Sequence, residues 1–518
     1  MKSAEKNPDK ELYKQLRRLT CEQLWEEEVP KFDRATPEER IKRVSLIRAV
    51  GVVFSESGTE AQKNAIKPWL HRLLQDPAEK VRRYAMAAMP KLGAGERDET
   101  ELLALLRTTN VEREKKFLAQ ALDKIGGSAT LESLGQSADE GLSRTQQKVK
   151  ANVARTEQPS AVRMDSTLNE FTGLRIHFRG RSGLEQIAAE EIEGAKTGKF
   201  RVENVNSGLI AITPVAPFSL GDIFAFRCFG TAGFVLGEVD LRSGSDSMEA
   251  VAEVITSVLA RRIFKTFTEG SLRYRLNFVA KGHQRGAVRL IAERAYALDP
   301  GILNDARDAP WAIDIHPLAD GRSSVELRPR LTPDPRLFYR QNDVPASSHP
   351  PLAACMARLS RDGEAEIVWD PFCGSGLELI ERCLLGGVRR VYGTDLSHEA
   401  IGITKANFAA AKLSAVEARF TRCDFREFAE RGGLGPNSLS LIITNPPMGK
   451  RVPIPDLDQL IDDLFQVAAT MLKPGGRLVF ANPLPIEPRQ RTLRRKSRRV
   501  VDFGGFDCRL EVYVKQAH

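Results

Sequence analysis

The segment Asp370-Pro371-Phe372-Cys373-Gly374-Ser375-Gly376 places an acid and two glycines at the end of a predicted strand, residues 366–371. Glycines let the backbone turn sharply and approach a ligand closely. A dinucleotide-binding loop would have a third glycine where this chain has Leu379, and a nucleotide-hydrolysing loop would be followed by a lysine that is absent here. The segment therefore predicts a ligand-binding loop, but not one that binds NAD or hydrolyses ATP. The alternative is a glycine turn with only a packing role.

Two further acids end the next two predicted strands. Asp395 ends the strand at 389–395, where a carboxylate can accept hydrogen bonds from a ribose diol. Asp424 ends the strand at 418–424, where it could accept from an adenine amino group. Each acid could instead only cap the helix that follows it. Together with the glycine loop, the two acids predict a pocket shaped for a nucleoside.

The segment Thr444-Asn445-Pro446-Pro447-Met448-Gly449 ends the fourth predicted strand, residues 439–445. Its two prolines remove backbone donors, which leaves carbonyl oxygens and the Asn445 side chain as acceptors. Such oxygens can hold both protons of a planar exocyclic amine and stabilise the positive charge that forms as a methyl group arrives. Alignment of this kind can supply roughly 7–11 kcal/mol of the barrier. The alternative is a strand-ending Pro-Pro turn without a chemical role.

These motifs, in this order, resemble those of the S-adenosylmethionine-dependent amino-methyltransferases of RNA, DNA and protein glutamine. The first motif is most similar to that of the THUMP-domain methyltransferases that modify guanosine N2 in tRNA and rRNA. Residues 338–354 resemble that family's cofactor-covering segment, and short fragments between residues 179 and 236 resemble its ferredoxin-like and THUMP region. The resemblance covers about residues 172–515, and it implies S-adenosyl-L-methionine as cofactor and a structured RNA as partner.

The resemblance also implies roles for individual residues. Asn445 and the Pro446 carbonyl would orient the amine, Pro447 would shape the turn, and Met448 would line the base pocket. The family usually has Tyr or Phe in place of Met448, and thioether contact with a base is weaker than aromatic stacking. The implied cofactor-binding residues are Asp370, Pro371, Phe372, Cys373, Gly374, Gly376, Asp395, Leu396, Asp424 and Phe425.

Other functions stay open from the residues alone. The same chemistry could act on adenine N6 or on a protein glutamine, and a catalytically weak RNA-binding scaffold is a further alternative. Cytosine C5 methylation is disfavoured because it needs a cysteine nucleophile on or after the fourth strand, and past Asn445 only Cys508 remains. Guanosine N2 lies inside a base-paired stack, so an RNA substrate implies base extrusion.

The motifs fall in the last part of a multidomain protein, since 518 residues suggest about three domains. Residues 336–518 alternate strands and helices, which predicts an α/β Rossmann-like methyltransferase domain closed by a hairpin. Residues 171–335 mix short strands with helices, which predicts an α+β region with a few helices over a small mixed sheet. The resemblance implies that this region is a ferredoxin-like or THUMP-like RNA-capture region. The polar segment 136–170 predicts a linker.

Residues 1–135 show helical periodicity throughout. Residues 73–93 align with residues 105–126 at an offset of 33, and each segment reads as a turn followed by a helix closed by glycine. We expect an N-terminal α-solenoid of HEAT-like repeats that could bind a protein partner. An ordinary helical bundle is the alternative.

The chain carries 77 Lys and Arg against 68 Asp and Glu, a net charge of +9 that permits a nucleic-acid partner. Seven of the eleven residues from 489 to 499 are basic and none is acidic. This basic run follows the fifth predicted strand, so we expect it near the catalytic end of the sheet, where it would bind RNA phosphates. A solvated surface run is the alternative. The candidate RNA-binding residues are Lys450, Arg451, Arg489, Arg491, Arg494, Arg495 and Lys496.

Composition limits the other function classes. No apolar run reaches the ~20 residues of a membrane span, and the N-terminus shows no apolar signal core, so a cytoplasmic protein without a membrane partner is expected. The seven cysteines include no C-x-x-C pair, which supports neither a disulfide framework nor a zinc ribbon. The seven histidines form no metal-binding motif, and no metal is expected.

Overall fold

The structure is a computed structural model, and it divides the chain into two compact units, residues 1–159 and 160–518. The division falls within the predicted linker, much of which lies outside the described residues. The regions 171–335 and 336–518, which the sequence suggests are separate domains, belong to one unit. The structure describes residues 8–93, 95–135, 142, 145–146, 149, 152–153, 157, 159–242, 245–280, 282, 284–345, 347–431, 433–449 and 454–517.

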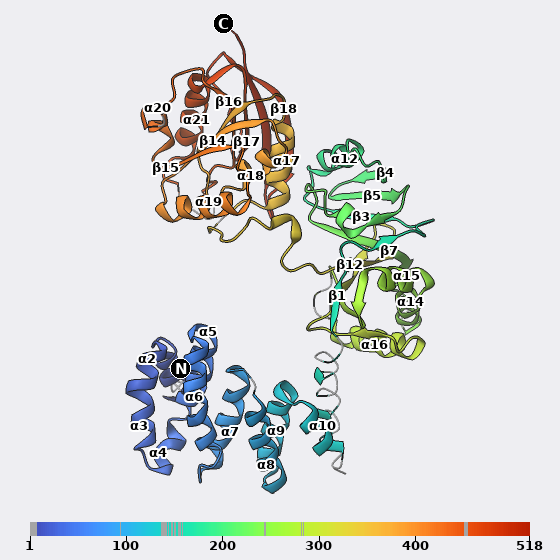
Figure 1. The fold of residues 1–518 in the computed structure, drawn as a ribbon, viewed down its shortest axis with the longest axis vertical. Coiled ribbons are helices and arrows are strands. Elements are labelled where there is room, and N and C mark those ends of the chain that lie inside the picture. Colours follow the sequence, from blue (N-terminus) through green and yellow to red (C-terminus); the bar gives the residue numbers. More distant parts are fainter. Residues whose placement is uncertain are drawn as a thin grey trace, which may run out of the picture. The chain divides into compact units, whose positions relative to one another are not determined.

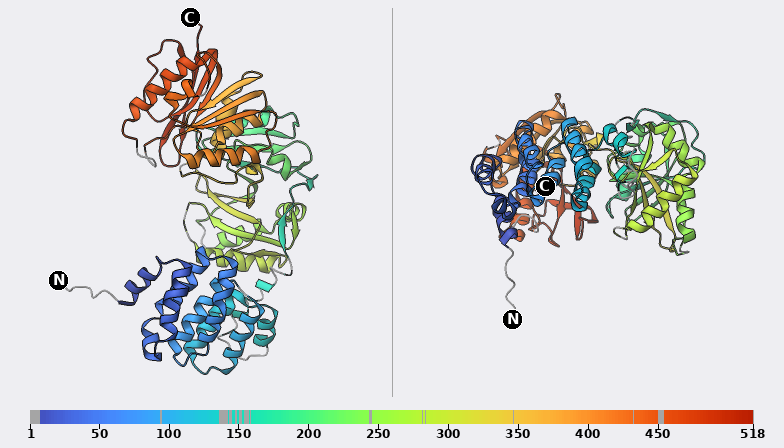
Figure 2. Two further views of the ribbon diagram at one scale, coloured as in Figure 1. Left: turned by 60° about the vertical axis from the view of Figure 1, so that its left-hand side comes forward. Right: turned by 90° about the horizontal axis from the view of Figure 1, so that it is seen from below.

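The first unit is built from helices between residues 8 and 135, as the sequence predicts (Figures 1 and 2). The aligned segments fall on α7 and α9, which pack against each other and are joined by Arg82 Nε donating to Glu114 Oε1 over 2.5 Å. The arrangement as a HEAT-like solenoid stays a prediction. The helices are α1 Pro8–Leu16, α2 Cys21–Gln23, η1 Leu24–Glu28, α3 Val29–Asp33, α4 Pro37–Lys42, α5 Ser45–Ser57, α6 Glu60–Leu73, α7 Glu79–Ala88, η2 Met89–Lys91, α8 Glu96–Thr108, α9 Glu112–Ile125 and α10 Ser128–Gly135.

The second unit begins with an eight-stranded mixed sheet in the order β10-β9-β11-β12-β7-β3-β5-β4. β9 runs parallel to β10 and β11, and the other neighbouring strands are antiparallel. The sheet is mixed, as predicted, but larger than the small sheet that the sequence suggests. Its elements are β3 Ile176–Arg179, α12 Glu185–Glu193, β4 Phe200–Asn206, β5 Leu209–Pro214, α13 Leu220–Ile223, β7 Thr231–Val239, α14 Ser245–Ile255, α15 Val258–Phe267, β9 Leu272–Phe278, α16 Arg285–Leu298, β10 Ile302–Asn304, β11 Trp311–Pro317 and β12 Ser323–Pro329.

Two short ribbons accompany this sheet, and a 3-10 turn follows it. The ribbons pair β1 with β8 and β2 with β6, and the turn η4 leads toward the C-terminal sheet. These short elements lack the length of apolar alternation by which strands are found in a sequence. Their bounds are β1 Ser160–Val162, β8 Thr268–Gly270, β2 Thr167–Leu168, β6 Phe218–Ser219 and η4 Pro335–Leu337.

The C-terminal part is a seven-stranded sheet in the order β15-β14-β13-β16-β17-β19-β18. Strands β13 to β17 are parallel, and β18 and β19 form the predicted antiparallel hairpin. This is the predicted Rossmann-like α/β arrangement (Figure 1). Its elements are α17 Pro350–Ser360, β13 Glu366–Asp370, α18 Leu377–Leu384, β14 Val388–Asp395, α19 His398–Ala410, β15 Glu417–Arg422, η5 Phe425–Glu427, α20 Phe428–Arg431, β16 Leu439–Thr444, α21 Leu457–Met471, β17 Leu472–Asn482, β18 Leu493–Asp502 and β19 Asp507–Lys515.

Both faces of the central strands β13 and β16 are buried, which explains their near-continuous apolar runs. Successive side chains of a strand point to opposite faces. Val368 of β13 belongs to the core that includes Leu352 of α17 and Ile380 of α18, whereas its neighbour Trp369 belongs to the core with Leu464 of α21. Helices on both sides therefore hold the strand ends that carry the motifs.

The loop before α12 packs against the C-terminal hairpin. The Asp502 N–H donates to the Ser182 carbonyl over 3.0 Å, and Arg181 Nη1 donates to the Asp502 carbonyl over 3.0 Å. Gly183 has a φ of +94°, and a Cβ there would lie 2.0 Å from the Val500 carbonyl oxygen. This backbone-to-backbone contact requires glycine.

We expect Gly183→Ala to destabilise the second unit more than Gly173→Ala does. Gly173 also has a positive φ, +74°, so alanine brings backbone strain of about 1–2 kcal/mol at both positions. Nothing lies within 4 Å of a Cβ at Gly173, whereas at Gly183 the hairpin must move, which costs a further ~1–3 kcal/mol. Thermal unfolding of the two variants measures this difference. Equal unfolding midpoints would contradict the contact.

Candidate functional site

The predicted motifs meet at the carboxyl ends of the parallel strands. β13 ends at Asp370, β14 at Asp395 and β16 at Thr444. β13 lies between β14 and β16, so the chain winds in opposite directions on its two sides. Ligands of α/β sheets bind at such a switch point. Thr444 Oγ1 donates to Asp370 Oδ1 over 2.5 Å and joins the two motifs directly.

The glycine loop bends over β14 and is fastened to it. Gly374 and Gly376 have φ values of +50° and +84°, which glycine adopts without strain. The Gly374 N–H donates to Asp395 Oδ2 over 3.1 Å, and a Cβ on Gly376 would lie 3.0 Å from Thr404 Cγ2. The Cys373 thiol is buried, and burial raises its pKa well above the usual range. Cys373 therefore packs as a small apolar group rather than a nucleophile.

Asp370 offers an unused acceptor at the centre of this rim. Its Oδ1 accepts from Thr444 and from the Phe372 N–H at 3.0 Å, while its buried Oδ2 has no hydrogen-bond partner among the described residues. Burial and the nearby Glu378 carboxyl raise the pKa of Asp370 well above its usual range. A cationic N–H donor placed here would satisfy Oδ2 and favour the charged carboxylate.

Asn445 offers a second unused acceptor. Its Nδ2 donates to Ser348 Oγ over 2.8 Å, and the Ser348 hydroxyl in turn donates to Glu378 Oε1. Because the amide nitrogen is engaged, the carbonyl oxygen Oδ1 is the atom left over, and it is buried without a partner in the described part of the chain. Pro446 is buried, and Met448 is half-buried.

The covering segment, residues 338–354, is fastened over the glycine loop by Asn407 of α19. Asn407 Oδ1 accepts from the Gln341 N–H at 2.9 Å, and its Nδ2 donates to the Ser375 carbonyl over 2.9 Å. Ser347 Oγ and Ser375 Oγ lie 2.9 Å apart. The sequence motifs do not include Asn407, Ser347, Ser348 or Glu378. The resemblance of the covering segment includes Ser347 and Ser348, and no sequence signal points to Asn407 or Glu378.

The third acid of the predicted pocket has a structural partner. Asp424 is the N-cap of η5, where its Oδ1 accepts from the Arg426 N–H at 2.9 Å, and it forms an ion pair with Arg426. The capping alternative is therefore what the structure shows, and a contact with an adenine amine stays a prediction. Phe425 packs on Phe372 with ring centroids 4.9 Å apart, and Leu396 is 67% exposed.

The position predicted for the basic run is wrong for most of it. β18 begins at Leu493, opposite Lys515, and reaches the catalytic end of the sheet only at Asp502. Residues 483–492 lead from the carboxyl end of β17 back to the far end of the sheet before β18 starts. A sequence pattern does not reveal this return. The far end therefore holds Arg494 and Arg495, and Arg489 pairs with Asp462 of α21. Arg491 precedes β18, and Lys496 lies half-way along it.

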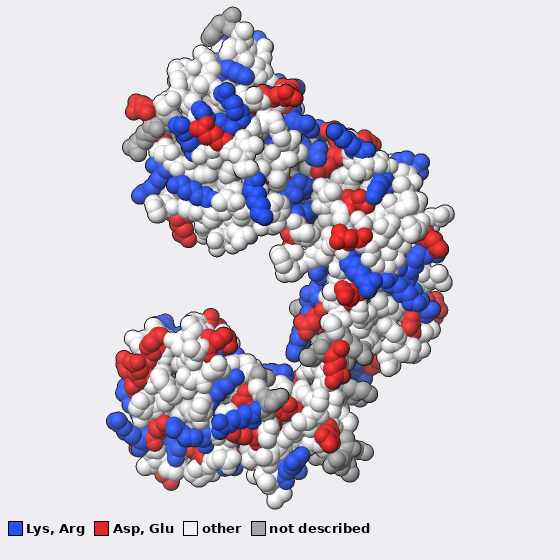
Figure 3. Space-filling model, in the orientation of Figure 1, with Lys and Arg blue, Asp and Glu red and all other residues white. Residues whose placement is uncertain are grey.

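Basic residues are not gathered in one patch on the visible face of the second unit, where acidic residues lie between them (Figure 3). Lys450 and Arg451, predicted to bind RNA, lie outside the described residues. The position of the basic run therefore does not support the prediction that it binds RNA.

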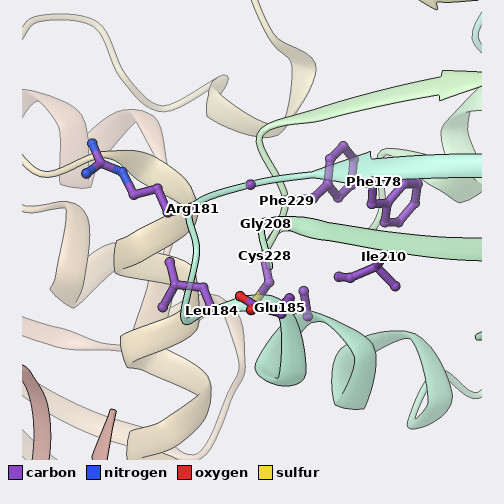
Figure 4. Close-up of a pocket in the computed structure, with 10 residues that line it drawn as sticks. Phe178, Arg181, Leu184, Glu185, Gly208, Ile210, Cys228 and Phe229 are labelled. Atoms are coloured by element: carbon purple, nitrogen blue, oxygen red, sulfur yellow. The ribbon is translucent and has the colours of Figure 1, made fainter. Parts of the chain in front are cut away.

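A small hollow lies beneath the loop before α12 (Figure 4). Phe178, Ile210 and Phe229 line one side, and the Arg181 side chain points away from it. Its volume of about 10 Å³ is room for one water and not for a nucleoside. Across the described residues, no helix has the length and hydrophobicity of a membrane span, and no cluster of His, Cys, Asp and Glu is placed to hold a metal ion.

Residues 338–510 match the family model described as "RMKL-like, methyltransferase domain". The tRNA (guanine(10)-N2)-dimethyltransferase of Methanocaldococcus jannaschii is 31% identical over 154 residues, which are 29% of this chain and 42% of that protein. The enzyme of the same name from Methanothermobacter thermautotrophicus is 30% identical over 160 residues, 30% of this chain and 43% of that protein. The chain thus spans less than half the length of these two relatives.

Among solved structures, TrmN from Thermus thermophilus aligns with a TM-score of 0.51 at 20% identity, covering 66% of this chain and 99% of that one. This likeness concerns the fold. Residues 338–510 are therefore similar to RMKL-like methyltransferase domains, and the chain shares the fold of the Thermus protein over the aligned part.

Proposed function

We propose that this protein transfers a methyl group from S-adenosyl-L-methionine to an exocyclic amine of RNA, guanosine N2 of tRNA. The observation that carries the proposal is the buried Oδ1 of Asn445, which has no hydrogen-bond partner among the described residues and lies beside the Pro446-Pro447 turn at a switch point of a Rossmann-like sheet. The methyltransferase family match and the names of the two archaeal relatives support it.

The residues at the rim fit S-adenosyl-L-methionine. Its ammonium group would donate to the unpartnered Oδ2 of Asp370, and its ribose diol would donate to Asp395, whose oxygens keep free lone pairs beside the N–H groups they accept. Leu396 and Phe425 would flank the nucleoside. When bound, the cofactor supplies an electrophilic methyl group on a sulfonium, so no strong base has to act on the amine during transfer.

Asn445 performs the main task of this chain in the reaction. Its Oδ1 and the Pro446 carbonyl accept the two protons of the target amine and thereby direct the nitrogen lone pair at the methyl group. The same oxygens stabilise the positive charge that develops on the amine. Pro447 fixes the turn, and Met448 contacts the extruded base.

The rest of the chain supplies RNA binding in this proposal. Residues 171–335 act as a ferredoxin-like or THUMP-like capture region, and the HEAT-like helices of residues 1–135 hold a protein partner. rRNA is the second RNA class. The rival substrates are adenine N6 and a protein glutamine, and the further alternative is a catalytically weak RNA-binding scaffold.

The test is a transfer reaction with the full-length protein and methyl-labelled S-adenosyl-L-methionine, run separately with unmodified tRNA, unmodified rRNA and a protein extract as acceptors. We expect label in N2-methylguanosine after digestion to nucleosides. Label in N6-methyladenosine or in a protein substrate would assign one of the rivals. No transfer to RNA or protein would support the scaffold alternative.

We expect Ser348→Ala to lower kcat about 10–100-fold, because loss of the bond to Asn445 Nδ2 frees the amide to rotate away from the amine. KM for the cofactor should change little, since the Ser348 hydroxyl bonds to Glu378 and Asn445 and not to the glycine loop among the described residues. Steady-state kinetics with RNA and cofactor varied separately measure this split.

Two variants check that Ser348 acts through position. Ser348→Thr keeps the hydroxyl and should retain activity. Burial raises the pKa of Glu378, which favours the neutral form of its carboxyl, and Glu378→Gln keeps an acceptor for Ser348. Glu378→Gln should therefore be more active than Glu378→Leu. Full activity of Ser348→Ala would remove Ser348 from the mechanism.

A further inference from the structure

A cavity of about 260 Å³ lies beside the candidate site, where the covering segment meets the loop before β7 and the helix α18. Its lining includes Arg227, Arg336, Arg340 and His349. His349 directly follows Ser348, whose hydroxyl accepts from Asn445. One lining residue of the cavity, His349, is therefore the sequence neighbour of the serine that contacts Asn445.

The walls of this cavity hold more positive than negative charge. Three guanidinium groups line it together with two carboxylates, those of Asp334 and Glu381. Glu381 accepts from Arg227 Nε at 2.7 Å and Nη2 at 2.8 Å, and from the Tyr339 hydroxyl at 2.5 Å. Both carboxylates are thus engaged within the wall, because Asp334 accepts from Arg336 in the same two-point manner.

Arg340 is the most accessible of the three arginines. Its side chain is 26% exposed, against 18% for Arg227 and 6% for Arg336. Its Nη2 pairs with Asp343, a residue outside the cavity lining, and among the described residues its other guanidinium nitrogens make no hydrogen bond and can bind a ligand. Arginine matches the geometry of phosphate oxygens through such paired N–H groups.

His349 adds an unused polar atom to the same wall. Its Nδ1 is buried and has no hydrogen-bond partner in the described chain. Burial and the positive charges of Arg181, Arg340 and Arg336 lower the pKa of His349 to about 4. The imidazole is thus neutral near pH 7, and an anion in the cavity would offset the positive potential of these arginines.

We propose that this cavity binds a phosphate group of the RNA strand beside the nucleotide that enters the catalytic cleft. Arg340 contacts the phosphate, and the ion pairs of Arg227 with Glu381 and of Arg336 with Asp334 keep the wall behind it rigid. Extrusion turns a nucleotide about its backbone, so the flanking phosphates stay at the mouth of the catalytic pocket. The inference rests on the proposed function for the identity of the strand.

The test is the salt dependence of tRNA binding by the full-length protein. Each phosphate contact adds about 0.7–0.9 to the slope of log affinity against log salt. We expect Arg340→Gln to lose one such contact, so that between 50 and 200 mM salt the wild-type protein loses about threefold more affinity than the variant does. Arg340→Lys keeps the charge and should keep the wild-type slope.

Arg390→Gln is the matched control. Arg390 is also ion-paired and 29% exposed, but it lies at the start of β14, far from the strand ends that carry the motifs. Its variant should show the wild-type slope. A wild-type slope for Arg340→Gln as well would overturn the proposal.

Inorganic phosphate, observed by its phosphorus resonance, is the second probe and separates a small phosphate compound from RNA. Phosphate binding that Arg340→Gln abolishes, with unchanged RNA slopes, would assign the cavity to a small ligand and overturn the proposal. Because the slope is measured without methyl transfer, its result stands apart from the proposed function. A lower salt slope in Arg340→Gln, together with no RNA methylation by the wild-type protein, would refute only the proposed function. RNA methylation by the wild-type protein, together with an unchanged slope in Arg340→Gln, would refute only the cavity proposal.

Discussion

Asn445→Ala is expected to lower methyl transfer to RNA by at least about 10²-fold, while binding of S-adenosyl-L-methionine stays unchanged. Removal of one preorganised group that stabilises transition-state charge costs about 10²–10³ in kcat in other enzymes. Asn445 supplies that group here, since its Oδ1 is buried, unpartnered and fixed by the bond from Nδ2 to Ser348. Single-turnover transfer to tRNA measures the loss, and calorimetric titration measures cofactor binding.

Asn445→Asp is the informative companion variant. It keeps an acceptor oxygen for the amine but loses the Nδ2 group that donates a hydrogen bond to Ser348 Oγ. We expect its transfer rate to lie between those of the wild type and Asn445→Ala. A wild-type rate for Asn445→Ala would show that the amine is oriented by other groups.

Asp370→Asn is expected to weaken cofactor binding about 10–100-fold. Oδ1 would still accept from Thr444 and the Phe372 N–H, but the new amide would present protons to the cofactor ammonium in place of Oδ2. A hydrogen bond to a charged group contributes about 1.5–3 kcal/mol, which corresponds to this range. Titration of the cofactor into both proteins gives the ratio.

The pH dependence of cofactor binding supplies a second readout for Asp370. Its pKa is raised by burial and by Glu378, so at low pH the empty site holds a neutral acid that must release its proton to receive a cation. Wild-type affinity should therefore rise as the pH rises through that pKa, and Asp370→Asn should lose this rise. Asp362→Asn, at an exposed acid before β13, should keep both the affinity and the rise. An unchanged dissociation constant in Asp370→Asn would remove Asp370 from the cofactor site.

The parallel strands could be predicted because burial on both faces leaves a plain signal. All six residues of β16 are buried, and its end coincides with Asn445-Pro446. β18 gives the opposite case. Its residues 494–496 are basic and exposed, and the strand exists because β19 pairs with it along its length. The closing hairpin was predicted, but no local pattern shows that its pairing extends back over residues 494–496, so the basic residues were expected at the wrong end of the sheet.

The sequence predicts only those residues of the candidate site that belong to its motifs. Asp370 and Asn445 each follow a strand, and parallel strands bring their ends together whatever the loops do. The Ser348 contact with Asn445 joins residues 97 positions apart, and it depends on how the covering segment folds over the sheet. Such a contact leaves no spacing in the sequence by which to find it.

The most direct test of the proposed function is nucleoside mass spectrometry of tRNA and rRNA from cells that contain the protein and from cells that lack it. The proposed function predicts that N2-methylguanosine, or its dimethylated form, falls in one RNA class when the protein is absent and returns with the wild-type protein but not with Asn445→Ala. Unchanged amounts of every N2-methylated guanosine would contradict guanosine N2 as the target.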